Sequence, residues 1–431
     1  MAQNKRIAIQ GALAQVHSFI APVRRLPDEI LFHIFQKLLG GRQTLLLRLM
    51  LVCRKWHGVV SSYPALWAHI SILYRSWNFN FLRPGQHLKK VTTFLTRSRE
   101  VLLDIDIQVS DGEDFHRGCK SELGWDSDDD GHTALSCDKV DAIYLELRTL
   151  LNILVGIGGC HMKRWKSFSY WTPSPTSQLK TYCGLKVLQY PAPQLQELFL
   201  RGWDPEHSFG EAPRLSRLVL EAWNGLVSLC PTMSSITELI VQPEAWSERE
   251  AYALFQLLSL CHRLKVFRLY TVFFLAGQLQ NPPKPRLSLP SLQDLEVQSG
   301  EIFDYFLATL DLPNLINIDI LIREEENYGA TTLPQTAWPT WFRTICRLGI
   351  ELPESNATRL HAFLGAAQGM EVLTIGPKMR KRVEEMLAVD LALCPKLKAL
   401  RVLSYIRVPY DNIPLSYNAK FSIIPFSTRQ T

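Results

Sequence analysis

The sequence contains none of the short motifs that mark common catalytic sites. It has no G-x-S-x-G, no P-loop, no H-E-x-x-H and no glycine-rich phosphate loop. Cys160 and His161 are adjacent, but neighbouring side chains on a strand or loop usually point apart, so we do not expect a thiolate–imidazole pair. We therefore expect a protein that is not an enzyme.

Long hydrophobic runs are also missing. The two most apolar stretches, LNILVGIGG and LYTVFFLAG, stop at nine residues, about half of the ~18 needed to cross a bilayer. The first 25 residues lack a continuous apolar segment followed by a small-residue cleavage site. We expect no membrane partner and a cytoplasmic and/or nuclear location.

Cysteine is present, but not in a paired pattern. The chain has nine cysteines, an odd number, and no C-x2-C pair. This distribution is typical of reduced thiols, and it argues against a disulfide framework and against a structural zinc site. We expect no metal, no cofactor and no glycosylation of the sequon Asn356-Ala357-Thr358.

The net charge of +6 conceals an uneven distribution. Residues 111–130 hold eight acidic and two basic residues, so this segment carries −6 and the rest of the chain about +12. Asp126, Asp128 and Asp130 match the start of a calcium loop, but Cys137 stands where that loop needs a glutamate. We expect a disordered acidic insertion at about residues 110–138 rather than a calcium site.

The basic run KMRKR (378–382) has two interpretations. It is similar to a nuclear signal or a nucleic-acid patch. It also fits the exposed start of a helix, with acidic residues at 384 and 385 close by on the chain. We favour the helix and expect no nucleic-acid partner.

Beyond about residue 100 a pattern L-x-x-L-x-L recurs about a dozen times, where L is any large apolar residue. Clear copies end at positions 200, 220, 241, 269, 297, 320 and 402, and the first six are spaced by 20, 21, 28, 28 and 23 residues. These intervals fall in the ~20–29 window of leucine-rich repeats. Weaker copies are LLDIDI (102–107), WKSFSY (165–170), LKVLQY (185–190), ICRLGI (345–350) and MEVLTI (370–375). The copy at 185–190 begins only ten residues before the next one, so we expect a hairpin or a degenerate copy there.

Each copy alternates apolar and polar residues in its second half, as a short strand does. Helix-like stretches such as SEREAYALFQLLSLC (247–261) separate the copies. A single such unit cannot bury its apolar face, whereas stacked units share one core. We therefore predict an α/β fold with an irregular leucine-rich-repeat solenoid over residues 100–405; the alternative is an ordinary α/β domain rich in leucine. The predicted positions on the concave face are Gln196, Glu197, Phe199, Ser216, Arg217, Val219, Thr237, Glu238 and Ile240.

Residues 26–72 predict a compact helical block. In LPDEILFHIFQKLL (26–39) the apolar side chains cover an arc of about 200°, whereas a helix on a single core needs only ~100°. Gly40 should end this helix, and Thr44 should cap a second helix that ends before Ser61. The surplus apolar surface indicates that something besides the protein's own core covers part of the first helix, and we expect that part to be exposed together with Leu26-Pro27.

This block resembles an F-box. Leu26-Pro27, an acidic helix start, an Ile/Leu/Phe stripe, Leu-Val-Cys-Arg-Lys-Trp at 51–56 and Leu66-Trp67 follow the order of that family's pattern. The resemblance implies docking on a Skp-type adaptor and, through it, a cullin, so that the rest of the chain would capture a protein substrate for an SCF-type ubiquitin ligase. The residues that the resemblance assigns to the adaptor contact are Leu26, Pro27, Ile30, Leu31, Ile34, Phe35, Leu51, Val52, Cys53 and Trp56.

The sequence thus divides into an N-terminal segment (1–25), an all-helical F-box (26–72), a linker with the first helix of the array (73–99), the solenoid (100–405) and a C-terminal tail (406–431). An alternative is that the helical block only caps the array, because terminal repeats need capping. The chain would then be a scaffold outside any ligase. The substrate, and the edge of the first helix that faces the adaptor, are left open by the sequence.

Overall fold

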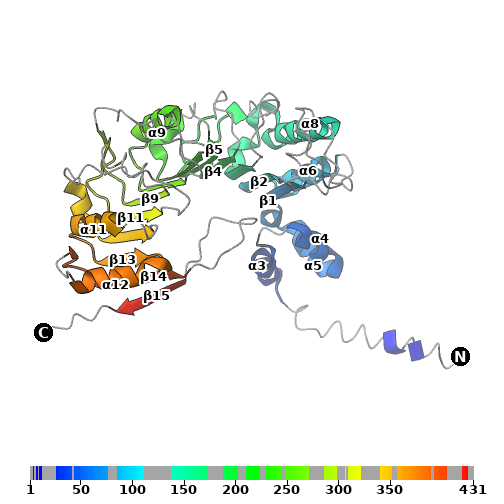
Figure 1. The fold of residues 1–431 in the computed structure, drawn as a ribbon. Helices are drawn as coiled ribbons and strands as arrows, with labels where there is room; N and C mark the ends of the chain where they lie inside the picture. Colours follow the sequence, from blue (N-terminus) through cyan, green and yellow to red (C-terminus); the bar gives the residue numbers. More distant parts are fainter. Residues whose placement is uncertain are drawn as a thin grey trace, which may run out of the picture. The chain divides into compact units, whose positions relative to one another are not determined.

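The computed structural model describes residues 26–40, 43–75, 85–110, 137–171, 188–201, 210–223, 230–243, 248–270, 286–298, 309–321, 340–351, 357–389, 393–404 and 420–425, with a few isolated residues besides. The chain forms two compact units, residues 1–195 and 196–431. Figure 1 shows their helices and strands. The expected acidic insertion, with its candidate calcium loop, lies outside the described residues except at its ends, where a strand finishes and a helix begins.

The described residues between 28 and 67 lie mostly in helices, as predicted. Asp28 and Glu29 occupy the first turn of the first helix, where the positive end of the helix dipole stabilises their carboxylates. Gly40 ends the first helix with a φ of 41°, a left-handed conformation that glycine adopts without strain. The helical segments are α3 (Asp28–Leu39), α4 (Gln43–Val52), α5 (Arg54–Ser62) and the 3-10 turn η1 (Pro64–Trp67).

The predicted second helix proves to be two helices. Cys53 has a φ of −162° and a ψ of 167°, an extended conformation that separates α4 from α5. Thr44 lies inside α4 instead of capping it, and α5 continues through Ser62. The sequence around Cys53 has no glycine or proline, so local signals predict an uninterrupted helix there.

A parallel sheet begins inside the range predicted to be all helical. The first strand pairs with the second and the second with the third, all in parallel. Ile70, Ile72 and Tyr74 of the first strand are fully buried, as the two-residue period of a strand requires. The described elements of this part, in chain order, are β1 (His69–Arg75), α6 (Gln86–Ser98), β2 (Leu103–Ser110), α8 (Cys137–Val155), the 3-10 turns η4 (Ile157–Gly159) and η5 (Met162–Arg164), and β3 (Trp165–Trp171).

Trp67 joins the helical block to α6. Its indole is 1% exposed and donates Nε1–H to the Val60 carbonyl at 2.7 Å. Phe94 of α6 packs edge-on against it with ring centres 5.0 Å apart, and the Arg97 guanidinium lies 4.3 Å from the ring centre. A buried indole with a satisfied donor and a cation over its face is a strong packing point. The helical block and the start of the sheet are therefore packed together within the first unit.

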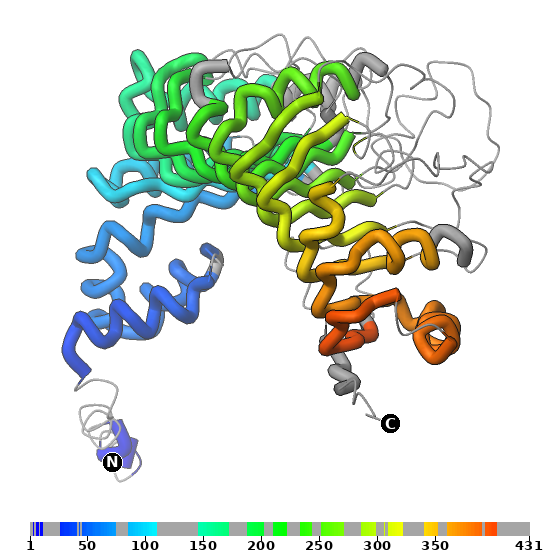
Figure 2. Tube along the Cα trace, turned by 90° about the vertical axis from the view of Figure 1, so that its left-hand side faces the viewer, coloured from blue at the N-terminus to red at the C-terminus, as the bar shows by residue number. Residues whose placement is uncertain are grey.

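The second unit is a mostly parallel sheet with helices. Its parallel strands are β4 (Glu197–Arg201), β5 (Arg217–Trp223), β6 (Glu238–Pro243), β7 (Val266–Tyr270), β9 (Asp294–Gln298), β11 (Asn317–Leu321), β12 (Arg347–Glu351), β13 (Val372–Ile375) and β14 (Ala399–Ser404). Each pairs with the next one in this order. Figure 2 shows the repeated course of the chain through them. Among the described residues, the α-helices of this unit are α9 (Glu248–Leu260), α11 (Ala357–Ala366) and α12 (Arg380–Val389), and the 3-10 helices are η8 (Cys230–Ser235), η9 (Thr340–Thr344) and η11 (Pro377–Met379).

Nearly all predicted repeat copies contain a strand. The exception is the copy at 185–190, where Leu188 lies in a turn. Within a strand the predicted alternation holds: Leu198 and Leu200 are at most 1% exposed, whereas Glu197 is exposed. The predicted helix at 247–261 is confirmed as α9. No helix among the described residues is long and apolar enough to cross a membrane.

One expectation about this unit is wrong, and two of its features were not predicted. Val219 is 3% exposed and Ile240 1%, although both were expected on an accessible face. The predicted tail contains a strand, β15 (Lys420–Pro425), which pairs with β14 in the antiparallel direction. Two short strands outside the main sheet, β8 (Leu287–Ser288) and β10 (Leu310–Asp311), pair with each other and match no repeat copy.

Candidate functional site

Helix α3 has one buried and one exposed apolar stripe. Leu31 and Phe35 are 1% exposed and Leu39 9%. One position earlier in each turn, the exposed fractions are 45% at Ile30, 44% at Ile34 and 53% at Leu38. Side chains four residues apart lie on one face of a helix, so these three form a continuous apolar strip, which we call the α3 stripe. The apolar side chains of this helix are therefore divided between the protein's own core and its surface, as predicted.

The buried stripe faces α5. Phe35 packs against Trp56 with ring centres 4.9 Å apart and planes inclined at 64°. In this edge-to-face geometry the positive edge of one ring contacts the negative face of the other, which is a favourable arrangement. Because Trp56 occupies that side of α3, the α3 stripe is the edge left free in the chain by itself.

Helix α4 also exposes apolar side chains. Leu46 and Leu49 are buried at 0% and 6% exposure, whereas Leu51 is 84% exposed and Val52 58%. Leu47 is 60% exposed. Groups of exposed large apolar side chains on a soluble domain mark interaction sites more often than isolated ones do. Two helices of the same block therefore offer apolar surface to a partner.

The Leu26–Pro27 segment is held in place at the start of α3. Lys55 donates a hydrogen bond from Nζ to the Leu26 carbonyl at 2.6 Å, and its Nζ lies 3.6 Å from Asp28 Oδ1. The Pro27 carbonyl accepts the amide of Leu31 at 3.1 Å. Pro27 is exposed and Leu26 is half-buried. A lysine of α5 thus orients the exposed proline beside the first turn of α3.

The predicted adaptor residues fall into three groups. Pro27, Ile30, Ile34, Leu51 and Val52 are exposed, while Leu26, Cys53 and Trp56 are half-buried. Leu31 and Phe35 are core residues that a partner cannot reach without unpacking α3, so they can only support the surface from within. Leu38 and Leu47 are exposed but were not among the predicted contact residues; for Leu38, its place four residues after Ile34 was a sufficient signal.

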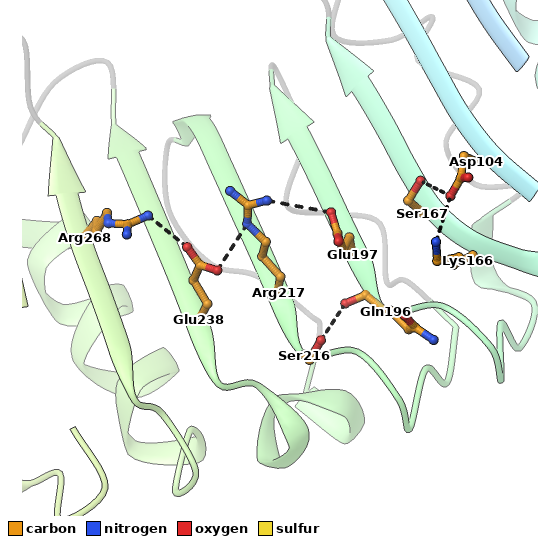
Figure 3. Close-up of polar contacts among 9 residues, drawn as sticks. All are labelled: Asp104, Lys166, Ser167, Gln196, Glu197, Ser216, Arg217, Glu238 and Arg268. Carbon is orange, nitrogen blue, oxygen red and sulfur yellow. Dashed lines mark hydrogen bonds and ion pairs between the residues drawn. The ribbon is translucent and has the colours of Figure 1, made fainter. Parts of the chain in front are cut away.

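A second candidate surface crosses the strands of the second unit. Arg217 lies 3.7 Å from Glu197 and 3.3 Å from Glu238, and Arg268 lies 2.9 Å from Glu238 (Figure 3). On its other side, Arg268 lies 3.2 Å from Glu296. The residues therefore alternate in charge across β4, β5, β6, β7 and β9. Each partly exposed pair contributes little stability, about 0–1 kcal/mol. Burial, and then the nearby carboxylate of Asp319, raise the pKa of Glu296.

The charges in this row are paired within the row, so the row indicates no ligand. Its cations and carboxylates are paired with one another, and the apolar positions beside it, Val219 and Ile240, are buried. In the first unit, Asp104 likewise accepts a hydrogen bond from Ser167 at 2.9 Å and lies 4.0 Å from Lys166 (Figure 3). We find no unpaired charge in either group that calls for a partner.

Two candidate sites of the sequence remain, the Cys160–His161 pair and the basic run. Cys160 and His161 do not point apart as expected: a Cβ built on Gly156 would lie 2.5 Å from Cys160 Sγ and 2.7 Å from His161 Cδ2. The described residues contain no cluster of three metal-ligating side chains. In the basic run, Arg380 pairs with Glu384 at 2.9 Å and Lys381 with Glu385 at 3.9 Å. Residues 380–382 of the run form the exposed start of α12, as predicted, whereas Lys378 and Met379 lie in the preceding 3-10 helix η11 (Pro377–Met379), where Met379 is buried.

Residues 23–73 match the F-box-like family. The match covers α3, α4, α5 and η1, and with them the α3 stripe and the exposed apolar side chains of α4. It supports the resemblance seen in the sequence and identifies the helical block as an F-box-like region. F-box domains bind Skp-type adaptors and are typically non-catalytic. No curated protein matches the chain.

Proposed function

We propose that this protein is the substrate-recognition subunit of an SCF-type ubiquitin ligase. The observation that carries the proposal is the α3 stripe, an exposed apolar strip within the region that matches the F-box-like family. A helix that offers anchors at i, i+4 and i+8 is suited to helix-in-groove docking on another protein. The adaptor would cover the α3 stripe, Pro27 and the exposed leucines of α4, and would link the chain to a cullin.

The rest of the chain would capture the substrate. We interpret the sheet and its helices as a leucine-rich-repeat-like solenoid, because its parallel strands follow one another in sequence order and carry a recurring apolar pattern at repeat-like intervals. Such arrays present extended surfaces for protein partners. A location in the cytoplasm and/or nucleus follows from this proposal.

Co-purification with a Skp-type adaptor tests the proposal. The intact chain should form a stable complex, and replacing Leu26 and Pro27 by alanine should weaken it. With the cullin and a ubiquitin-conjugating system added, a protein captured by the chain should be ubiquitinated only when the F-box-like region is intact. Failure of the intact chain to bind any Skp-type adaptor would exclude the proposal.

One observation favours a second candidate, a scaffold whose helical block only caps the sheet. The Gln43 side chain of α4 donates a hydrogen bond to the His69 carbonyl of β1, and exposed strand edges need such protection. A pure cap has no use for apolar side chains on its outer surface. Under this alternative, substitution of the α3 stripe by polar residues should leave the cellular lifetime of every captured partner unchanged.

A further inference from the structure

A groove runs along the edge of the second unit where the strands begin. At this edge, the residue before each strand gives its carbonyl to two successive amides of the next repeat. Lys265 O accepts from Gln293 and Asp294 at 2.9 and 3.0 Å, and Gln293 O accepts from Ile316 and Asn317 at 2.9 Å. The turns before β7, β9, β11 and β12 therefore stack in register. Between them lies an open groove of about 460 Å³, the rim groove, lined among others by Lys265, Pro290, Ser291, Pro313, Ile316 and Thr344.

Hydrogen bonds between neighbouring turns fix the walls of the rim groove. Ser291 Oγ donates to the His262 carbonyl at 3.0 Å, and Asn314 Nδ2 donates to the Pro290 carbonyl at 2.8 Å. Pro290 and Pro313 have no amide hydrogen to offer. Since the amides of Gln293 and Ile316 are already used between repeats, a ligand would be recognised by the side chains of the groove and not by strand addition.

The exposed charged side chains on the turns around the rim groove are cationic. Arg263, Lys265 and Arg343 are exposed on the turns at 261–265 and 340–346, and Lys265 lines the groove itself. The four turns (261–265, 289–293, 312–316 and 340–346) contain no aspartate or glutamate. The nearest carboxylates along the chain, Asp311 and Asp294, lie outside these turns, where they accept hydrogen bonds from Ser288 Oγ at 3.3 Å and from Asn317, respectively. The exposed charges on the four turns themselves are therefore positive.

The rim groove also has an apolar contact point. Ile316 is 42% exposed and lies at the end of the 312–316 turn, beside the 340–346 turn, whose Cys346 amide donates to the Ile316 carbonyl at 2.9 Å. The aromatic side chains of the 340–346 turn, Trp341 and Phe342, are buried at 4% and 0% exposure. Single-stranded nucleic acid is bound largely by stacking on exposed aromatic rings, and the four described turns expose none. A peptide with acidic and aliphatic side chains fits this chemistry better.

We propose that the rim groove binds an extended acidic segment of a partner protein, with its carboxylates near Lys265 and Arg343 and an aliphatic side chain on Ile316. The binding itself does not depend on the F-box-like region. That the bound protein is a ligase substrate rests on the function proposed above.

Peptide binding by the intact purified chain tests this inference. The probe is an array of random peptides graded from acidic through neutral to basic, followed by fluorescence anisotropy with the best acidic peptide. Lys265→Glu and Arg343→Glu should each weaken its binding by about tenfold, and added salt should weaken it further. Ile316→Ser should weaken binding without altering the salt dependence. Lys396→Glu is the matched control, because this exposed lysine lies on the turn before β14, outside the groove.

The inference is overturned if the array shows no preference for acidic peptides, if Lys396→Glu is as damaging as Lys265→Glu, or if a single-stranded oligonucleotide competes the acidic peptide away. Adaptor binding by the Lys265→Glu variant separates the two proposals. If that variant binds the adaptor and the acidic peptides fail on the wild type, only the groove inference is lost. If acidic peptides bind as described and the adaptor does not, only the ligase function is lost.

Discussion

Ile34 and Phe35 are neighbours on α3 with opposite environments: the Ile34 side chain is 44% exposed, whereas Phe35 is 1% exposed and packs against Trp56. One residue step on a helix is a rotation of ~100°, enough to pass from the core to the surface. Both residues are large and apolar, so their burial and not their chemistry separates a structural role from a binding role. Substitutions of these two residues can therefore test protein stability and adaptor binding separately.

Phe35→Ala should destabilise the first unit by about 3–5 kcal/mol, because it removes a buried aromatic side chain and leaves a cavity beside Trp56. Ile34→Ala should change the free energy of unfolding by less than about 0.5 kcal/mol, because its side chain is already largely in water. Thermal or denaturant unfolding of the two variants measures the difference. Equal losses of stability would show that α3 packs differently from this structure.

Lys55→Met should weaken adaptor binding by about tenfold with little change in overall stability. The substitution keeps an apolar stem of similar length but removes the hydrogen bond to the Leu26 carbonyl and the ion pair with Asp28. The loss of a charged hydrogen bond that orients a contact segment has about this effect. Arg54→Met, at an exposed neighbour on α5, is the control. If both variants bind the adaptor equally well, Lys55 does not position Leu26–Pro27.

Gly349→Ala should destabilise the second unit by about 1–3 kcal/mol. A Cβ built on Gly349 would lie 1.8 Å from Asp319 Oδ1 and 2.9 Å from its Cγ, so the Asp319 side chain occupies the space above the glycine. In the double variant Gly349→Ala with Asp319→Ala, most of this loss should be recovered. Asp319→Asn should recover little, since it keeps the size of the side chain. A double-mutant cycle of unfolding free energies measures the coupling, and additive effects would contradict the predicted clash.

Acid should destabilise the first unit through His87. Burial, and then the charge of Lys90, lower the pKa of His87 to about 4. The folded state thus keeps this histidine neutral between pH 6.5 and about 4, whereas the unfolded state takes up a proton. The stabilising contribution of His87 is complete above pH 6.5 and is lost as the pH falls towards 4, by about 1–3 kcal/mol.

The variant His87→Gln tests this pH dependence. Its melting temperature should fall less than that of the wild type between pH 6.5 and pH 4. His262→Gln changes an exposed histidine and serves as the control, with the slope of the wild type. If the melting temperatures of the wild type and His87→Gln fall equally between pH 6.5 and pH 4, His87 does not cause the loss of stability in acid.

Local pattern predicted most of the fold because several strands in this chain alternate buried and more exposed residues with a two-residue period. Leu198 and Leu200 alternate with Glu197 in sequence and in burial. The strand at His69–Arg75 was missed because it directly follows the last turn of the F-box pattern, and the break at Cys53 has no glycine or proline to mark it. Val219 and Ile240 were misplaced because alternation assigns a side chain to a face of the sheet, while its burial depends on residues distant in sequence.

The candidate site was predicted in part. The width of the apolar arc on α3 implied an exposed stripe, and the structure shows one. Which edge is exposed depends on the position of Trp56, a contact across 21 residues of chain that no local pattern encodes. For the same reason Leu31 and Phe35 were assigned to the partner when they belong to the core. The rim groove is formed by turns from four different repeats, so no single stretch of sequence shows it.

The most direct test of the central claim is the dissociation constant of the intact chain for a purified Skp-type adaptor, compared with that of the Ile34→Glu variant. The account predicts saturable binding by the wild type and a loss of at least about a hundredfold in the variant, whose unfolding transition should be unchanged. Absence of saturable binding by the wild type, or equal affinities of the two proteins, would contradict it.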